Sequence, residues 1–388
     1  MGRERAAAAL GRSGRGAAFD VWSPGRINLI GDHIDYSGGL VLPMAIDRGT
    51  SAVVFPREDR LLRGHSQNFP DAGVVTADID SLDFDEDRGW FSYVLGVLWA
   101  ARDEGMEMSS GFDIALTGDI PEGGGLSSSA SVEMVVAMAC ERMYSPGWDA
   151  TRWAVIGRRA ENEYIGVASG IMDQLAIARG RRGRALLMDC STLEVRYVDF
   201  PTDRATVLVA NTKSPRRLAD SAYNDRREAV ERAARIVGAR SGVGERGLAT
   251  VPPGDVEGCR AELTGAGVWA EAHHTVTEQA RVVAAAEALA TGDVVEVGRL
   301  MRESHESLRD DFRVTGLHLD ALAEAAWLTP GVIGARMTGA GFGGCTVNLV
   351  EVGMAEQAAV GISRRYAAAT GITPEVFAVS PGAGAHVV

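Results

Sequence analysis

A short segment near the N-terminus, RINLIGDHIDYSGG, concentrates side chains that can recognise a ligand. It contains Asp32, His33 and Asp35, which follow directly after Gly31. Because carboxylates accept hydroxyl hydrogen bonds strongly, these residues on a glycine-flanked turn suit a polyhydroxylated ligand. The pattern leaves a solvated turn without a ligand open as an alternative. A metal site is disfavoured, because one histidine and two aspartates on a tight turn seldom converge on one ion.

A second segment, PEGGGLSSSAS at residues 121–131, lies between an expected strand and an expected helix. Its consecutive glycines let the backbone turn N–H groups inward to form an anion-binding nest. The serines then fall at the N-terminus of the helix, where free N–H groups and the positive end of the dipole favour phosphate. A serine hydroxyl there can also ligate Mg²⁺. The segment favours phosphate binding over its alternative, a flexible loop with a serine cap.

Two acidic residues follow in the segment AENEYIGVASGIMDQ, at Glu161 and Asp173. Asp173 is flanked by the apolar residues Met172 and Leu175. An apolar environment raises the pKa of a carboxyl group, which makes Asp173 a candidate general base. A helix cap is the alternative role for this residue.

The segment GAGFGG at residues 339–344 has the spacing GxGxxG, but its context argues against a dinucleotide site. A dinucleotide fingerprint opens a helix. The residues that follow, CTVNLV, instead have the composition of a strand. We therefore expect a glycine turn that packs closely against another loop.

The composition excludes several kinds of chemistry. The 388 residues carry 39 basic and 52 acidic side chains, and the formal net charge of −13 argues against nucleic-acid and membrane partners. Lys213 is the single lysine, so the P-loop motif and the strand lysine of protein kinases are absent. No apolar run approaches the roughly 18 residues of a membrane span. A nucleotide site in this chain must therefore neutralise phosphate with other groups.

The four cysteines, Cys140, Cys190, Cys259 and Cys345, show no CxxC spacing. This disfavours a zinc ribbon or a redox dithiol. Cysteines scattered in this way are typical of buried side chains in a reducing compartment. The first residues lack a secretory apolar stretch, so we predict a cytoplasmic protein whose residues 1–18 form a flexible tail.

The elements that must position these residues mix strands and helices without a regular βαβ alternation, which favours the α+β class. Strands are expected within 19–60, at 111–118, 185–190, 193–200, 205–212, on both sides of the glycine turn within 332–350, and at the C-terminus. Helices are expected at 91–103, 130–143, 150–165, 221–240, 268–290, 292–311 and 354–370. Residues 241–258 are rich in glycine and proline and are expected to connect elements.

Taken together, these segments resemble the GHMP kinase superfamily, and within it the galactokinase family. GRINLIGDHIDYSGGLVLP resembles the family's sugar-binding signature, PEGGGLSSSAS its phosphate loop and GARMTGAGFGGC its third motif. GIMDQ, SAYNDRRE and SHESLRDDF are also similar to galactokinase segments. The resemblance extends from about residue 19 to the C-terminus. The first motif and GIMDQ are specific to galactokinase-type sugar kinases, whereas the phosphate loop indicates only the superfamily.

The resemblance implies roles for individual residues. Arg26 would stabilise the transferred phosphoryl group, Asp173 would act as the base, and Ser129 and Glu161 would hold Mg²⁺. The phosphates of ATP would be wrapped by one loop, formed by Gly123, Gly124, Gly125, Leu126, Ser127, Ser128 and Ser129, and Ser66 would touch the nucleotide. The sugar pocket would be lined by Asp32, His33, Ile34, Asp35, Gly170 and Tyr223. In this arrangement Mg²⁺, Arg26 and a helix N-terminus replace the missing lysine.

The resemblance also implies a fold. Residues 19–205 would form an N-terminal domain similar to the second domain of ribosomal protein S5, which binds sugar and ATP. Residues 206–388 would form a C-terminal ferredoxin-like domain, with the site in the cleft between the two. A monomer or a weak homo-oligomer is expected.

The activity that the resemblance implies is ATP-dependent phosphorylation of D-galactose at its anomeric hydroxyl. Two departures concern the choice of sugar: Asp32 stands where the family usually has glutamate, and Ala168 and Ser169 stand where it commonly has Pro-Cys. The same reaction on L-arabinose, N-acetylgalactosamine or galacturonate is therefore an alternative. A non-catalytic sugar sensor is disfavoured, because Ser129, Ala130 and Asp173 are all present.

Overall fold

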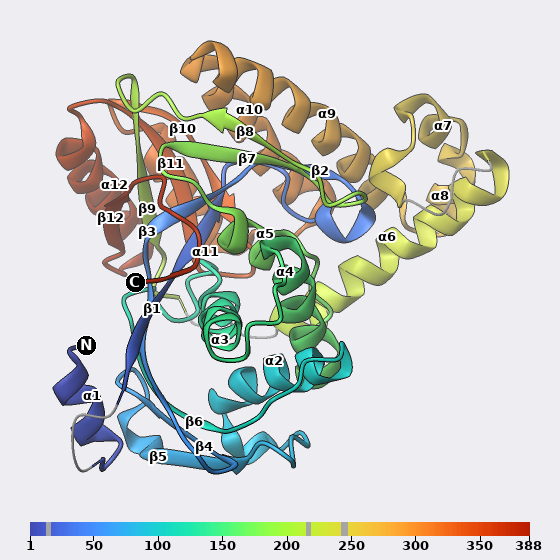
Figure 1. Ribbon diagram of the computed structural model, residues 1–388. Helices are drawn as coiled ribbons and strands as arrows, with labels where there is room; N and C mark the ends of the chain where they lie inside the picture. The colour runs from blue at the N-terminus through green and yellow to red at the C-terminus, as the bar shows by residue number, and fades with distance from the viewer. Residues whose placement is uncertain (13–16, 215–218, 242–246) are drawn as a thin grey trace.

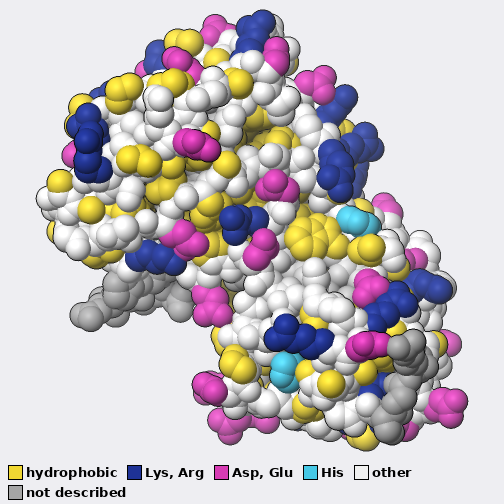
Figure 2. Space-filling model, turned by 90° about the vertical axis from the view of Figure 1, so that its left-hand side faces the viewer, with side chains coloured by type: hydrophobic (Ala, Val, Ile, Leu, Met, Phe, Trp, Pro, Cys, Tyr) yellow, Lys and Arg dark blue, Asp and Glu magenta, His cyan; other side chains and the backbone are white. Residues whose placement is uncertain are grey.

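The computed structural model describes residues 1–12, 17–214, 219–241 and 247–388, and the molecule has the α+β architecture expected from the sequence (Figure 1). In the space-filling view it narrows between two lobes (Figure 2). The face in view carries both acidic and basic side chains on each lobe. Within the described ranges, no helix is long and apolar enough to cross a bilayer.

A six-stranded sheet forms the base of the N-terminal lobe, in the order β13-β1-β3-β6-β4-β5. Its strands are β1 (Phe19–Asn28), β3 (Pro43–Pro56), β4 (Leu61–Ser66), β5 (Val74–Asp78), β6 (Phe112–Gly118) and β13 (His386–Val387). Only the pair β4–β6 is parallel. The long β1–β3 ladder shifts register between Pro24 and Arg26. A bulge of this kind re-aims the side chain that follows it, and here that side chain is Arg26.

Alternate residues of each strand point to opposite faces of this sheet, and helices cover both faces. Val54 of β3 belongs to a large core with α2 (Phe91–Asp103), α3 (Ser128–Tyr144) and α4 (Ala150–Arg159), and α5 (Met172–Arg179) lies beside them (Figure 1). Val53 and Phe55 face the other way and pack against Ala6 and Leu10. The N-terminal helix α1 (Arg3–Ala9) therefore covers the second face.

The C-terminal lobe contains a four-stranded antiparallel sheet in the order β10-β11-β9-β12. Its strands are β9 (Ala205–Asn211), β10 (Val332–Thr338), β11 (Cys345–Glu351) and β12 (Glu375–Val379). Helices α9 (Trp269–Thr291) and α10 (Val294–Ser307) pack on one face, and α11 (Gly316–Trp327) and α12 (Ala355–Thr370) on the other. The β-α-β-β-α-β succession is that of a ferredoxin-like domain, as expected.

The remaining elements connect or extend the lobes. A small sheet of β2 (Leu40–Val41), β7 (Arg184–Asp189) and β8 (Val195–Asp199) joins the core that both lobes share. Helices α6 (Ala219–Ser241), α7 (Pro253–Gly258) and α8 (Arg260–Gly265) project from the body (Figure 1). The connector expected at 241–258 thus contains α7, although its residues 242–246 lie outside the described ranges.

Three expectations need correction. Residues 1–12 of the expected flexible tail include α1, in which Ala6 is buried, and Leu10 directly after the helix is buried as well. The helix expected at 150–165 is α-helical only to Arg159 and continues as a π-helical turn over Ala160–Ile165. The sequence patterns also did not predict β4, β5, α5, α8 and α11. Of these, β4, β5, α5 and α8 have at most 8 residues each, so their local periodicity carries little signal, whereas α11 is a helix of 12 residues.

The expected division between residues 205 and 206 coincides with the start of β9. As a domain boundary it stays a prediction. The C-terminal end, however, returns to the N-terminal sheet, because Val387 pairs with Val21 and His386 with Trp22.

Candidate active site

The glycine- and serine-rich loop between β6 and α3 curls tightly at its centre. Gly123, Gly125 and Ser127 all have positive φ angles, of 64°, 75° and 61°. The loop delivers the chain to the first turn of α3, whose N–H groups have no partners within the helix and whose dipole is positive at this end. The loop and the helix therefore form a site suited to phosphate, as the sequence predicts.

Two glycines from other segments lie directly against this loop. A Cβ atom on Gly25 would lie 2.8 Å from the carbonyl oxygen of Leu126, and one on Gly339 would lie 2.8 Å from that of Gly125. The expectation that the 339–344 turn packs against another loop is thereby confirmed. This close backbone packing fixes the loop beside Arg26, whose N–H donates to the Leu126 oxygen at 3.2 Å.

Arg26 and Asp173 meet at the end of the phosphate loop. The Arg26 Nε and Nη2 atoms each donate to one carboxylate oxygen of Asp173 at 2.8 Å. The Ser127 hydroxyl donates to Asp173 as well, and Arg26 Nη1 donates to the Gly125 oxygen. Arg26 is almost fully buried, whereas Asp173 is 28% exposed. The two residues predicted to do chemistry are thus held together with one face of the carboxylate open.

The turn after β1 places Asp35 beside Asp173. Burial, together with the negative charge of Asp173, raises the pKa of Asp35 to about 6. Gly170 makes room for this carboxylate, because a Cβ atom there would lie 1.8 Å from Asp35 Oδ2. The sequence predicted both residues for the sugar pocket, and the structure brings them into contact.

His33 contributes an aromatic surface rather than a charge. Its ring lies against Phe312 and Tyr223, with centroids 4.9 and 5.5 Å away. Its Nε2 atom lies 3.2 Å from the Ala340 oxygen, which requires the proton on that nitrogen. Burial, together with the neighbouring His274, lowers the pKa of His33 to about 3, so the ring is neutral near pH 7.

Asp32 accepts a hydrogen bond from the protein on each of its two carboxylate oxygens. Its Oδ2 accepts from Arg336 Nη1, and its Oδ1 accepts from the Gly339 N–H at 3.0 Å. The side chains of Asp32 and Arg336 are 1% and 0% exposed. Burial raises the pKa of Asp32, and Arg336 opposes that rise.

Glu161 and Ser129, the predicted metal ligands, are in contact. The Ser129 hydroxyl donates to Glu161 Oε1 at 2.9 Å, and Glu161 Oε2 accepts from Ser169 at 2.8 Å and from Gln174 at 3.0 Å. The residue before Glu161 begins the π-helical turn, which takes Glu161 out of the regular helical spacing and points it at the phosphate loop. Burial raises the pKa of Glu161, and Asp173 adds to the shift.

A cavity of about 830 Å³ unites these groups. Most of the predicted site residues line it, namely Arg26, Asp32, His33, Asp35, Gly123, Gly125, Ser127, Ser128, Ser129, Glu161, Gly170, Asp173 and Tyr223. Gly124, Leu126, Ile34 and Ser66 are not among its lining residues. Ile34 is buried in the core, where its carbonyl accepts from Ser37 and Gly39, and Ser66 ends β4.

Several residues at this site were not predicted from the sequence. Arg336 lies within the quoted segment GARMTGAGFGGC but received no role, and Ser169 was noted only as a departure from the family. Glu278, which accepts from the Gly31 N–H, carries no sequence signal because it lies in the middle of a long helix.

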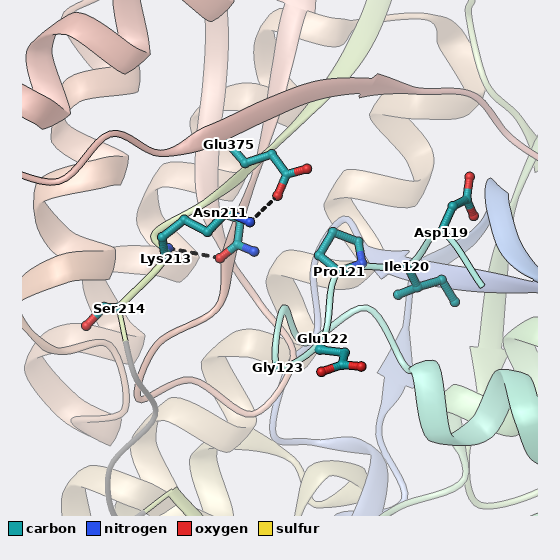
Figure 3. A pocket seen from close by; sticks show the side chains of 9 residues that line it. All are labelled: Asp119, Ile120, Pro121, Glu122, Gly123, Asn211, Lys213, Ser214 and Glu375. Atoms are coloured by element: carbon teal, nitrogen blue, oxygen red, sulfur yellow. Dashed lines mark hydrogen bonds and ion pairs between the residues drawn. The ribbon is translucent and has the colours of Figure 1, made fainter. Parts of the chain in front are cut away.

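A separate cavity of about 740 Å³ adjoins the phosphate loop at Gly123 (Figure 3). Residues 119–123 line one side, and Asn211, Lys213 and Glu375 lie opposite them. The Lys213 ammonium forms an ion pair with Glu375 at 2.5 Å. The single lysine, which follows β9, is therefore paired with the first residue of β12, and the residues predicted to do chemistry line the cavity of about 830 Å³.

Three family models match the chain in the segments that supply the site. The galactokinase galactose-binding signature matches residues 12–56, which include Arg26 and Asp35. The GHMP kinases N terminal domain matches 92–181, which include Ser129, Glu161 and Asp173, and the GHMP kinases C terminal model matches 285–368.

Similar proteins cover almost the whole chain. Galactokinases of Fusobacterium nucleatum and Bacillus subtilis are 41% and 38% identical, covering 95% and 94% of this chain and 94% and 93% of their own. A crystal structure of Lactococcus lactis galactokinase complexed with galactose is 35% identical, has a TM-score of 0.93 and covers 98% of this chain and 97% of that one. Methanococcus jannaschii mevalonate kinase, 18% identical with a TM-score of 0.67 and coverage of 95% and 100%, shares the fold alone. The chain therefore belongs to the galactokinase family of the GHMP kinases.

Proposed function

We propose that this protein transfers the γ-phosphoryl group of ATP to the anomeric hydroxyl of D-galactose, which gives α-D-galactose 1-phosphate and ADP. The observation that carries the proposal is the Arg26–Asp173 pair, which lies between the phosphate loop and the turn of Asp35. The galactose bound to the similar Lactococcus lactis enzyme supports this choice of sugar.

The reaction follows from the placement of these groups. The anomeric oxygen attacks the γ-phosphorus while its proton passes to the open side of the Asp173 carboxylate. The bond between the γ-phosphorus and the β,γ-bridging oxygen breaks, and ADP leaves with that electron pair. Arg26 and the N–H groups at the start of α3 stabilise the negative charge on the transferred group. Asp35 accepts sugar hydroxyl hydrogen bonds, and Gly170 keeps the space for it.

Magnesium fits the oxygen groups at the phosphate loop. Ser129 and Glu161 offer a hydroxyl and a carboxylate, which are the kinds of ligand that Mg²⁺ takes. Among the described residues, no group of three or more His, Cys, Asp and Glu side chains is arranged to hold a metal. Two protein oxygens with further ligands from the nucleotide and water match the usual kinase pattern. Bound there, Mg²⁺ would neutralise phosphate charge.

A galactose-like sugar is the second candidate substrate, and Asp32 is the observation that favours it. Aspartate is one methylene shorter than glutamate, and here both of its oxygens already accept protein hydrogen bonds. L-Arabinose, N-acetylgalactosamine and galacturonate differ from galactose in their substituents. If Asp32 selects among them, Asp32→Glu will shift the ratio of kcat/KM between sugars more than tenfold, whereas a uniform loss would remove this role.

The direct test is a coupled assay of ADP release over a panel of monosaccharides, with ATP and Mg²⁺. We expect galactose to give the highest kcat/KM and a product phosphorylated at the anomeric carbon. A higher kcat/KM for another sugar of the panel would replace galactose as the substrate. Sugar binding without ADP release from any member would instead support the non-catalytic sensor.

The metal ligands are tested by Glu161→Gln. We expect a higher Mg²⁺ concentration for the half-maximal rate and weaker Mn²⁺ binding, measured by electron paramagnetic resonance with ADP present. Glu163→Gln is the matched control, because Glu163 lies two residues after Glu161 in the same turn, is exposed and pairs with Arg159. Equal metal titrations for the two variants would exclude Glu161 as a ligand.

We also infer a cytoplasmic location and a monomer or weak homo-oligomer. None of the four cysteines, all of which lie in the described ranges, forms a disulfide bond, which suits a reducing compartment. Light scattering over a range of protein concentrations tests the oligomeric state.

A further inference from the structure

Four buried or nearly buried charges lie directly behind the sugar turn. Arg336 on β10 donates to Asp32, and its Nη2 atom lies 4.0 Å from Oε1 of Glu278 on α9. Arg281 donates to the other oxygen of Glu278 at 2.7 Å. The side chains of Asp32, Glu278 and Arg336 are at most 1% exposed, and that of Arg281 is 14% exposed. The negative charges of two carboxylates are thus neutralised by the positive charges of two guanidinium groups inside the protein.

This cluster holds the backbone of the turn as well as its side chain. Glu278 Oε1 accepts from the Gly31 N–H at 2.9 Å, and Arg336 Nη1 donates to the Asn28 carbonyl oxygen at 3.3 Å. Only glycine fits at position 31, where φ is 105° and a Cβ atom would lie 2.9 Å from Val282 of α9. The turn that follows β1 is therefore fastened to helix α9 and strand β10 of the other lobe.

We propose that Glu278 and Arg336 are positioning residues for sugar recognition, which hold the turn from Asn28 to Asp32 in its binding geometry. The inference rests on the proposed function, since it concerns the sugar pocket of that enzyme. Neither side chain lines the cavity, so both act through the turn rather than on the substrate.

The physical reason lies in the short side chain at position 32. Each carboxylate oxygen has two lone pairs. In Asp32, Arg336 uses one lone pair of Oδ2, and the Gly339 N–H uses one lone pair of Oδ1. The remaining lone pairs can meet a sugar hydroxyl only if the carboxylate keeps this orientation. Without Arg336, Asp32 is a buried charge without its cation, and the carboxyl group must turn away or take up a proton.

The test compares three variants by calorimetric binding of the sugar without ATP. Arg336→Met removes the guanidinium group and keeps its volume, and we expect the sugar dissociation constant to rise at least tenfold. Arg336→Lys keeps the cation and should recover part of the affinity. The double variant Arg336→Met with Asp32→Asn removes both charges, so it should fold even if the single methionine variant does not.

The readout that separates positioning from general destabilisation is the KM for ATP, which we expect to stay within twofold of the wild type. Asp113→Asn is the matched control, because Asp113 is a buried carboxylate with arginine partners in the N-terminal sheet, away from the sugar turn. It should lower the melting temperature and leave sugar affinity unchanged.

Two outcomes would overturn the inference: wild-type sugar affinity in Arg336→Met and in the double variant, or equal losses for sugar and ATP. All measurements use the sugar that the wild type phosphorylates. A different preferred sugar therefore changes the proposed function and leaves this test intact.

Discussion

At the scale of single residues, the site depends on carboxylates placed in different surroundings. Asp173 accepts two hydrogen bonds from Arg26 and one from Ser127, whereas Asp35 lies against Gly170 and has a raised pKa. One carboxylate is thus oriented by a cation, and the other is kept in a poorly solvated position. These surroundings suit a proton acceptor and a sugar ligand respectively.

Asp173→Asn should lower kcat by roughly 10²–10⁴-fold, because the amide cannot take the hydroxyl proton. ATP affinity should change little, since the phosphate loop keeps its own backbone contacts. Single-turnover kinetics and equilibrium binding of ATP measure the two effects separately. Wild-type turnover in this variant would remove Asp173 from the mechanism.

Asp35 should make sugar binding depend on pH. Its pKa of about 6 means that it is ionised near pH 7 and becomes protonated as the pH falls through 6. A protonated carboxyl group is a weaker acceptor for sugar hydroxyl groups, so the KM for sugar should rise as the pH falls below about 6. In Asp35→Asn the KM should be higher and lose this dependence. The KM for ATP over the same pH range is the control, and a parallel change would assign the effect to another group.

At the scale of elements, the phosphate loop is positioned by a strand and a turn that are distant in sequence. The bulge in β1 brings Gly25 under Leu126, and the turn after β10 brings Gly339 under Gly125. The loop's own glycines permit its curvature, but these outer contacts determine where it lies.

Gly25→Ala should therefore weaken ATP binding more than sugar binding. The added methyl group would lie 2.8 Å from the Leu126 oxygen and 3.0 Å from Ile120, so the loop must move. A displacement near 1 Å at a phosphate site can cost about 10²-fold in rate, and we expect the KM for ATP to rise roughly tenfold or more. Gly254→Ala on α7, where a Cβ atom meets nothing within 4 Å, is the control. Equal kinetics for the two variants would contradict the packing argument.

At the scale of the whole molecule, both lobes contribute to the proposed sugar pocket. The turn after β1 belongs to the N-terminal sheet, yet its fixed contacts come from α9, β10 and the turn after β10. The ion cluster of Asp32, Glu278, Arg281 and Arg336 therefore links this proposed pocket to the stability of the fold.

Glu278 should make stability depend on acid pH. Burial alone would raise its pKa, but Arg281, His274 and Arg336 together lower it from 4.5 to about 2. The folded state then binds fewer protons than the unfolded chain between these values, so Glu278 stabilises the fold above about pH 4.5 and loses this contribution as the pH falls through 2. Glu278→Gln should cost about 3 kcal/mol of unfolding free energy near pH 7.

Urea unfolding at several pH values measures this effect. The difference in unfolding free energy between Glu278→Gln and the wild type should become smaller as the pH falls below about 4.5. The exposed Glu296→Gln on α10 provides the control, with a small difference expected throughout. A difference that is constant with pH would mean that Glu278 contributes by packing rather than by charge.

The sequence by itself determined the fold class, the family and the identity of the main chemical groups. Glycine runs, serines at a helix start and closely spaced acids have local physical meanings, so PEGGGLSSSAS predicted a phosphate loop without a structure. Long amphipathic elements were predicted for the same reason, and the helix expected at 91–103 is α2 (Phe91–Asp103).

The tertiary structure alone decided which groups meet. Arg26 and Asp173 are separated by 147 positions, and Asp32 and Arg336 by 304, so no local pattern records their contacts. In the sequence, Glu278 cannot be distinguished from other charged residues of a helix. Only the fold shows that its carboxylate accepts a hydrogen bond from the Gly31 N–H. Helix α1 has a weak apolar face that becomes informative only when Val53 and Phe55 pack against it. Burial and long-range pairing arise when distant segments pack against one another, and this packing brings charged residues from both lobes into contact with the turn of the proposed sugar pocket.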